Sequence, residues 1–380
     1  MKQQNISKFA YKGLILLLLL NTNSFTSHAQ NEVKTQNTAV PFLLIAPEAK
    51  SSGMANTNLG MAPNTNDLFQ NAAKLANLQE NSGFSFNYTP WLTDIGLDNV
   101  YLLSTGYYKK INQSSAFHAS IKYFTLGTMD LTNDNGVPNL PSQRTGEFSI
   151  NAGYSLKITN QLSLGSSIKY IQSRLIQGNF NGTEYNAGNS IAGDISLYYQ
   201  QNENTEGFHA GMLLSNLGSK ISYSNNSKKY FLPANMGIGA GYTKSLDEKN
   251  TIEFGIDANR LLVPALASTA SPEQIDAYYS QSVLNSWFNS FSGNNSVNFG
   301  SAYKVSGGIE YNYDKVFYVR AGYHFEKTMN AGNINYYTTG TSLKYNNMKF
   351  HLSYIPPTTT GVARNPLSNT FSFGTSIHFN

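Results

Sequence analysis

The chain has 380 residues, no cysteine and a formal net charge of +4, and charged and aromatic residues make up 13% each. Charged residues are about half as frequent as in a soluble globular domain. No stretch beyond residue 29 approaches the roughly 20 apolar residues of a membrane-spanning helix. Without cysteine, disulfides and thiolate metal sites are excluded. This composition suits a sheet with one lipid-facing side and one wet side.

Residues 1–29 have the features of a secretory signal peptide. The positive n-region contains Lys2, Lys8 and Lys12, and the short apolar core runs from Leu14 to Leu20. A cleavage site with small residues follows at Ser27-His28-Ala29. We predict cleavage after Ala29, which exports the chain. Losing three lysines lowers the formal charge from +4 to about +1. No basic surface that would indicate a nucleic-acid partner then remains.

Residues 30–82 differ in sequence pattern from the rest of the mature chain. A short apolar run consists of Phe42, Leu43, Leu44 and Ile45. Further along, Asp67 is predicted to cap a short helix with one apolar face, formed by Leu68, Ala72, Leu75 and Ala76. We predict that this segment forms a plug, or hatch, inside a barrel. A mobile periplasmic tail is the alternative.

From residue 83 to residue 380 the sequence alternates between apolar and polar residues in segments of about ten, the length of a tilted strand that crosses a bilayer. We predict fourteen strands, at residues 84–90, 100–109, 116–125, 147–158, 162–174, 191–200, 207–216, 235–245, 251–260, 303–313, 316–326, 335–345, 347–355 and 370–379. The expected fold class is therefore an all-β, antiparallel transmembrane barrel. The alternative is a soluble β-sandwich or a large secreted barrel, in which the strands also alternate.

The connections support the barrel without reference to hydrophobicity. Those after the second, fourth and later even segments are short, whereas those after odd segments are mostly longer, the longest running from Leu261 to Ala302. Outer-membrane barrels have short periplasmic turns and long outer loops. We therefore predict the bacterial outer membrane as the location, with both chain ends on the periplasmic side.

Residues 372–379, within the last predicted strand, follow the alternating pattern polar, glycine, apolar, aromatic. This pattern resembles the C-terminal signal by which outer-membrane barrels are delivered to their assembly machinery, although Asn380 follows the final aromatic residue.

Several motifs resemble the PorV family, the outer-membrane β-barrels of the type IX secretion system of Bacteroidota, which are similar in turn to the fourteen-stranded FadL group with its N-terminal hatch. They are "AVPFLLIAPEAKSSGMANTNLGMAPN", "YTPWL" at 88–92, "GYYKKI", "SIKYFTLGTMDLTNDNG", "RLLVP" at 260–264 and "PLSNTFSF" at 366–373. One departure is Asn71-Ala72-Ala73, where relatives in the broader group carry Asn-Pro-Ala.

The resemblance implies a carrier that is not an enzyme and needs no cofactor. Its implied partners are the large outer-membrane translocon, the C-terminal domains of secreted cargo, a sortase-containing attachment complex and outer-membrane lipid. The longest connection carries aromatic residues of the types favoured at protein interfaces, which we assign as candidate partner-binding residues: Tyr278, Tyr279, Trp287, Phe288 and Phe291. Equally, they could pack on one another above the barrel rim.

Two other functions stay open. A transporter of hydrophobic molecules would hold a lipid-like ligand beside Phe42 to Ile45. A lipid-modifying enzyme would need a serine or histidine nucleophile site, for which the sequence offers no constellation. The five histidines of the mature chain are scattered singly and are expected to face a polar lumen without binding metal: His118, His209, His324, His351 and His378. The glycines of "GIGAGYTK" at 237–244 are expected to permit close backbone approach rather than to bind a nucleotide.

Overall fold

The protein was analysed as a computed structural model, which describes residues 34–92, 96–97, 99–129, 142–180, 182–225, 228–291, 302–327, 333–357 and 368–379. The chain divides into two compact units, Met1–Val33 and Lys34–Asn380, and the second contains all of these residues. None of the helices in these ranges is both long enough and apolar enough to cross a membrane.

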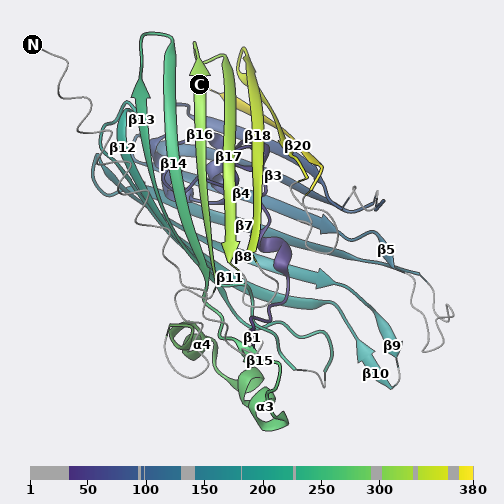
Figure 1. Ribbon diagram of the computed structural model, residues 1–380. Helices are drawn as coiled ribbons and strands as arrows, with labels where there is room; N and C mark the ends of the chain where they lie inside the picture. The colour runs from purple at the N-terminus through teal and green to yellow at the C-terminus, as the bar shows by residue number, and fades with distance from the viewer. Residues whose placement is uncertain are drawn as a thin grey trace, which may run out of the picture. The chain divides into compact units, whose positions relative to one another are not determined.

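Fourteen antiparallel strands close into a barrel (Figure 1). They are β2 (Ser82–Pro90), β3 (Tyr101–Asn112), β4 (Ser115–Thr125), β7 (Gly146–Lys157), β8 (Leu162–Arg174), β11 (Gly188–Gln200), β12 (Gly207–Gly218), β13 (Asn235–Ser245), β14 (Asn250–Leu261), β16 (Tyr303–Tyr313), β17 (Phe317–Lys327), β18 (Asn333–Tyr345), β19 (Met348–Ile355) and β20 (Thr370–Phe379). Each pairs with its neighbours in sequence, and β20 pairs with β2 to close the sheet. All fourteen predicted strands are confirmed, and every predicted end lies within three residues of the observed one.

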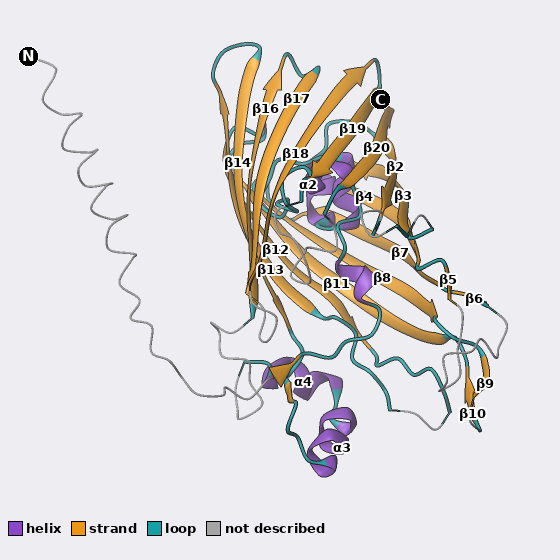
Figure 2. Ribbon diagram, turned by 45° about the vertical axis from the view of Figure 1, so that its right-hand side comes forward, coloured by secondary structure: helices purple, strands orange, loops and turns teal. Residues whose placement is uncertain are grey.

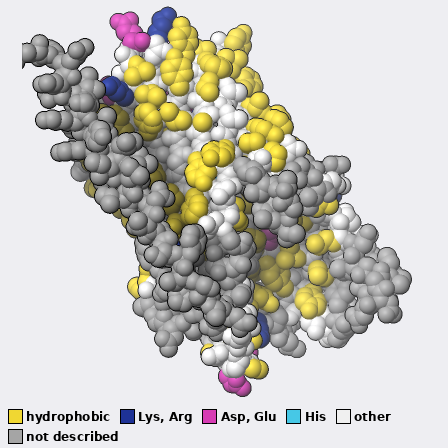
Figure 3. All heavy atoms as spheres, in the orientation of Figure 1, with side chains coloured by type: hydrophobic (Ala, Val, Ile, Leu, Met, Phe, Trp, Pro, Cys, Tyr) yellow, Lys and Arg dark blue, Asp and Glu magenta, His cyan; other side chains and the backbone are white. Residues whose placement is uncertain are grey.

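The two faces of the wall differ in chemistry because successive side chains of a strand point to opposite faces. On β7, Ile150, Tyr154 and Leu156 are exposed on the outer face, whereas Ser149 and Ser155 are buried on the inner face. Hydrophobic side chains cover much of the outer wall in Figure 3. The barrel therefore turns its apolar side outward and a polar side inward, the reverse of a soluble barrel.

The two ends of the barrel differ in the length of their connections. One end, which we call the turn rim, has the short turns that follow β3, β7, β11, β13, β16 and β18. The other end, the loop rim, has the longer connections. It carries the pairs β5 (Thr128–Met129) with β6 (Gln143–Arg144) and β9 (Gly178–Phe180) with β10 (Thr183–Tyr185), and in the longest connection β15 (Leu266–Ala267), α3 (Pro272–Ser280) and α4 (Val283–Asn289). Figures 1 and 2 show these elements together at one end.

Most of the N-terminal segment lies inside the barrel (Figure 2). It begins with β1 (Lys34–Thr35), which pairs with β15 at the loop rim, and continues as four short helices, η1 (Pro41–Leu44), α2 (Ala49–Ser52), η2 (Thr65–Phe69) and η3 (Ala72–Asn77). The predicted cap at Asp67 is wrong. Asn64 is the N-cap of η2, and Asp67 is the third helical residue of a capping box, so its carboxylate accepts the backbone N–H of Asn64 at 2.6 Å. The expected single helix is two 3₁₀ helices.

Glycines on the inner wall let the N-terminal segment approach the strands closely, because they have no side chain in its way. A Cβ added to Gly308 would lie 2.7 Å from the Cβ of Met54, whereas a Cβ on neighbouring Gly307 would meet nothing closer than 3.8 Å. In the "GIGAGYTK" stretch on β13, a Cβ on Gly239 would lie 2.9 Å from the backbone nitrogen of Gly60. The close backbone approach expected for these glycines is therefore present, and the N-terminal segment is what approaches them.

The prediction that both chain ends lie on the periplasmic side concerns terminal residues outside the described part of the chain, whose first and last described residues lie at different rims. Lys34 and Thr35 pair with Ala267 and Leu266 at the loop rim. Phe379, in contrast, pairs with Ser82 at the turn rim. The reason is that residues 40–81 run along the length of the lumen before the first strand begins, which separates the first described residue from the last.

Candidate functional site

A cavity of about 380 Å³ lies in the lumen, between the N-terminal segment and the inner wall. The segment contributes an apolar side formed by Leu43, Leu44 and Ile45. The strands contribute polar and charged side chains, among them Lys122 and Lys169. A space with one apolar side and a few polar groups is typical of small-molecule sites.

Most of the charged groups around this cavity are paired. Lys169 Nζ lies 2.8 Å from Asp194 Oδ2 and 2.9 Å from Asn216 Oδ1. Lys304 Nζ lies 3.2 Å from Glu326 Oε1. Lys122 is different, because no described residue forms a hydrogen bond or ion pair with it.

The indole of Trp91 adds a second donor beside the cavity. Its Nε1 is buried and has no hydrogen-bond partner among the described residues. The ring packs edge-on against Phe124, with 5.0 Å between ring centroids, and Phe124 lies two residues from Lys122 on the same face of β4. The Trp91 indole and the Lys122 ammonium are therefore neighbouring donors that an anionic or hydrogen-bond-accepting group could engage.

The four apolar residues assigned to the hatch divide into two pairs. Phe42 and Leu43 are buried in the cluster at the loop-rim end of the lumen, where Phe42 stacks on Phe124 with 6.3 Å between centroids. Leu44 and Ile45 are half-buried and, together with Leu43, line the cavity. Phe42 thus packs against the wall and does not line the cavity.

The five aromatic residues of the longest connection fall into two groups that differ in their surroundings. Tyr278 is only 3% exposed, packs with Phe231 and Val263, and donates its hydroxyl to the carbonyl of Pro264 at 3.2 Å. Burial raises the pKa of this phenol well above its usual range, so it remains a neutral donor. Tyr279 is half-buried against the same cluster. The packing alternative considered for these aromatics therefore describes these two.

The other three aromatics lie on and beside α4. Trp287 is half-buried, whereas Phe288 is 72% exposed and Phe291 is 48% exposed. Sequence reasoning missed Leu284, which is 61% exposed and lies one turn before Phe288 on the same helix face. The spacing of four residues between Leu284 and Phe288 was the available signal. These side chains form an exposed apolar group at the loop rim, which we call the α4 surface (Leu284, Phe288 and Phe291).

All five histidines lie on the inner wall. In the described part of the chain, no three His, Cys, Asp or Glu side chains are placed to hold a metal ion. His351 joins two serines, with Nδ1 2.7 Å from Ser342 Oγ and Nε2 3.1 Å from Ser376 Oγ. Arg320, which can only donate, gives a hydrogen bond to Ser342 at 2.6 Å. Both ring nitrogens of His351 therefore engage serine hydroxyls, and neither contacts a carboxylate among the described residues.

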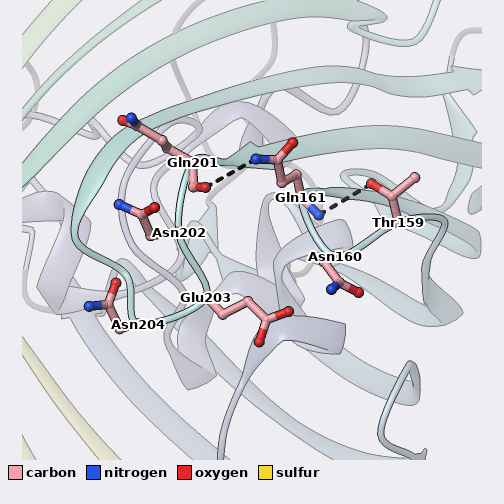
Figure 4. Close-up of a pocket in the computed structure, with 7 residues that line it drawn as sticks. All are labelled: Thr159, Asn160, Gln161, Gln201, Asn202, Glu203 and Asn204. Atoms are coloured by element: carbon pink, nitrogen blue, oxygen red, sulfur yellow. Dashed lines mark hydrogen bonds between the residues drawn. The ribbon is translucent and has the colours of Figure 1, made fainter.

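A larger depression of about 840 Å³ opens at the turn rim between the turns that contain Gln161 and Gln201 (Figure 4). Gln161 Nε2 donates to the carbonyl of Gln201 at 3.2 Å across it. All seven lining residues are exposed and polar. With no apolar wall and no buried polar group, this depression has the character of two hydrated turns rather than a binding site.

The sequence matches the family described as "Type IX secretion system protein PorV" over residues 27–268. The chain belongs to the PorV family. The predicted family resemblance is thereby confirmed, and the barrel is an outer-membrane component of the type IX secretion system. No curated protein matches the sequence.

Solved structures share the fold at low sequence identity. The toluene transporter TodX of P. putida is 11% identical with a TM-score of 0.53, and the match covers 88% of this chain and 98% of that chain. The toluene transporter TbuX of Ralstonia pickettii is 14% identical with a TM-score of 0.53, over 88% of this chain and 98% of that chain. The monoaromatic hydrocarbon channel CymD is 12% identical with a TM-score of 0.53, over 89% and 98%. At these identities the comparison establishes a common barrel fold.

Proposed function

We propose that this PorV-family barrel is a carrier of secreted cargo in type IX secretion. In this proposal it binds the C-terminal signal domain of cargo at the outer surface, associates with the outer-membrane translocon, and passes cargo to a surface attachment complex that contains a sortase. The family match over residues 27–268 is the observation that carries the proposal. The carrier itself performs no chemistry and needs no cofactor or metal.

The proposed orientation follows from the apolar outer wall and the unequal rims. The strands cross the outer membrane, the turn rim faces the periplasm and the loop rim faces outward. Cleavage after Ala29 would leave a mature chain that starts near Gln30. Residues 39–78 act as a hatch in this proposal, which is supported by the position of α2, η2 and η3 within the lumen (Figure 2).

The α4 surface is the proposed contact for cargo or translocon. Exposed Leu and Phe side chains are costly to leave in water, and aromatic residues are enriched where partners bind. Deleting residues 270–295 would also remove buried Tyr278 and disturb the rim. Point changes at exposed positions avoid that problem.

The double variant Leu284→Ser with Phe288→Ser tests this surface. We expect it to lose most of its co-purification with translocon and cargo, while the barrel keeps its heat-modifiable migration on gels. The matched control is Leu246→Ser, because Leu246 is 55% exposed in a turn at the opposite rim. Equal co-purification of the double variant and the control would refute the assignment of the α4 surface.

A transporter of hydrophobic molecules is the second candidate, supported by the luminal cavity. Its apolar side, Leu43 to Ile45, would hold a hydrocarbon portion, while unpaired Lys122 and Trp91 Nε1 would engage an acidic or polar end. Native mass spectrometry of protein from its own membrane would detect such a ligand. A bound acyl compound that is lost in Lys122→Met would favour transport. An empty lumen together with normal cargo secretion would count against it.

We further propose that the chain is not a lipid-modifying enzyme. The surroundings of His351 support this, because both of its ring nitrogens engage serine hydroxyls and no described carboxylate orients the ring as the third member of a triad would. Histidine-to-alanine substitutions, made one at a time, should leave the outer-membrane lipid profile unchanged. A changed lipid profile in any one of them would argue for the enzyme.

A further inference from the structure

We propose that residues 34–40 form a strap at the loop rim that lies outside the cell and braces the connection bearing α3 and α4. The claim that the strap shares a rim with the long connections is geometric. The claim that this rim faces the cell exterior rests on the proposed function. Together they put the strap outside the cell, beside the surface proposed for partners.

The strap is held by a series of contacts along its length. Lys34 and Thr35 pair with β15 in a two-stranded antiparallel sheet. Gln36 Nε2 donates to the carbonyl of Val263 at 2.5 Å. The Tyr278 hydroxyl lies 3.5 Å from the carbonyl of Asn37. Each contact joins the strap to the longest connection, so this part of the chain is fastened at the loop rim and does not return through the lumen.

A second connection is fastened to the same strap. Thr38 forms a parallel bridge with Phe231, and the backbone N–H of Ala39 donates to the Phe231 carbonyl at 2.9 Å. The Phe231 ring in turn packs edge-on against Tyr278, with 5.4 Å between centroids. The strap therefore links the connection at 219–234 with the one at 262–291, and it fixes the base from which α3 and α4 project.

The chain direction explains why the strap reaches this rim. Val40 is buried in the apolar cluster at the loop-rim end of the lumen, and the chain then passes α2, η2 and η3 before β2 begins at Ser82 on the turn rim. The segment inside the lumen thus runs from the loop rim to the turn rim. Its upstream end has to lie at the loop rim, on the side of the barrel opposite to the C-terminal strand end.

Single-cysteine labelling on intact cells tests the location of the strap. Because the sequence contains no cysteine, each variant carries only the introduced thiol. Three exposed positions are used, Thr35→Cys on the strap, Glu273→Cys on α3 and Glu248→Cys in the turn after β13. The probe is a membrane-impermeant maleimide, added before or after permeabilisation of the outer membrane. We expect Thr35→Cys and Glu273→Cys to react before permeabilisation and Glu248→Cys only afterwards.

The outcomes separate the two claims. Labelling of Thr35→Cys that follows Glu248→Cys would overturn the location of the strap. If Thr35→Cys and Glu273→Cys are both protected while Glu248→Cys reacts, the shared rim is upheld and the orientation within the proposed function is wrong. Reaction of Thr35→Cys and Glu273→Cys alone upholds both.

Gln36→Ala tests the brace itself. Loss of the hydrogen bond to Val263 should loosen the connection and expose Tyr278 and Tyr279 to chymotrypsin. We expect cleavage of the purified protein there to accelerate roughly five- to tenfold, the effect of one lost hydrogen bond of ordinary strength. Gln161→Ala at the turn rim is the matched control and should leave the rate unchanged. A rate for Gln36→Ala equal to that control would overturn the bracing role.

Discussion

The ion pair between Lys74 and Asp67 offers a sharp test of how the N-terminal segment is held. Lys74 Nζ lies 2.7 Å from Asp67 Oδ1, and both side chains are 0% exposed. The ammonium also donates to the Asn58 carbonyl at 2.9 Å. Asp67→Asn would keep the shape of the side chain but remove its charge. It would leave a cation buried without its partner.

The expected cost follows from burial. Removing one partner of a buried ion pair costs about 3–5 kcal/mol. The cost cannot exceed about 4.6 kcal/mol, because Lys74 can lose its proton instead of remaining charged. This value is the free energy of deprotonating, at pH 7, a lysine with an ordinary pKa near 10.4. Burial already lowers the pKa of Lys74 in the native protein. Since the barrel strands have their own hydrogen-bond ladder, the cost should fall on the segment alone, whose open population should rise roughly 150- to 2500-fold.

Trypsin provides the assay, since Lys50 and Lys74 are both buried cleavage sites within the segment. We expect Asp67→Asn to be cut at these lysines much faster than the parent protein in mild detergent, while the barrel keeps its heat-modifiable migration. Adding Lys74→Met to Asp67→Asn removes the unpaired cation and should restore much of the protection.

A matched control is Asp314→Asn. Its carboxylate lies 3.9 Å from Lys249, and the two side chains are 51% and 58% exposed, so the pair should contribute little. Cleavage of Asp67→Asn at the rate of this control would refute the argument from buried charge. Unfolding of the whole barrel in Asp67→Asn would instead refute the claim that the cost is local.

Three further predictions follow from the packing. Gly308→Ala should speed tryptic cleavage at Lys50, because overpacking against the N-terminal segment costs about 1–3 kcal/mol. Gly307→Ala should leave the rate unchanged, and equal rates for the two variants would contradict the close approach of Met54 to Gly308. Tyr278→Phe keeps the ring but loses the hydroxyl contacts, so chymotrypsin should cut the α3 connection roughly five- to tenfold faster, and an unchanged rate would contradict its anchoring role. Phe379→Ser, at the end of the strand that closes the barrel, should lower the amount of assembled barrel in the membrane, and full assembly would count against the C-terminal signal.

The strands could be predicted almost completely from the sequence because the two faces of the barrel wall contact two different environments. Lipid and a polar lumen impose a period of two over about ten residues, and β7 displays this from Phe148 to Leu156. Connection lengths added independent information, since tight turns and long loops alternate around an antiparallel barrel. Both signals are local in the chain, so a single sequence contains them.

The lumen could be predicted only in part, because its contacts join residues far apart in the chain. The apolar run and the turn residues indicated a folded segment before the barrel. No local pattern indicated that Asp67 pairs with Lys74 instead of capping a helix, or that Lys34 pairs with Ala267. The glycines of β13 were interpreted correctly as sites of close approach, yet the approaching segment could be identified only from the structure.

The rim aromatics show a different limit. Composition marked the longest connection as rich in interface-type residues, but composition does not separate buried Tyr278 from exposed Phe288. A loop has no periodicity that reports which side chains point outward. The helix in that connection did carry a usable signal, the four-residue spacing of Leu284 and Phe288.

Purification of the protein from its own outer membrane in mild detergent, with identification of co-purifying proteins by mass spectrometry, tests the carrier function most directly. The account predicts a very large outer-membrane translocon protein, a sortase-containing complex and secreted proteins that share a C-terminal domain. It also predicts that these proteins are depleted from the Leu284→Ser with Phe288→Ser variant and retained with Leu246→Ser. Recovery of the barrel alone with a bound acyl compound, in cells that secrete normally without it, would contradict the carrier function.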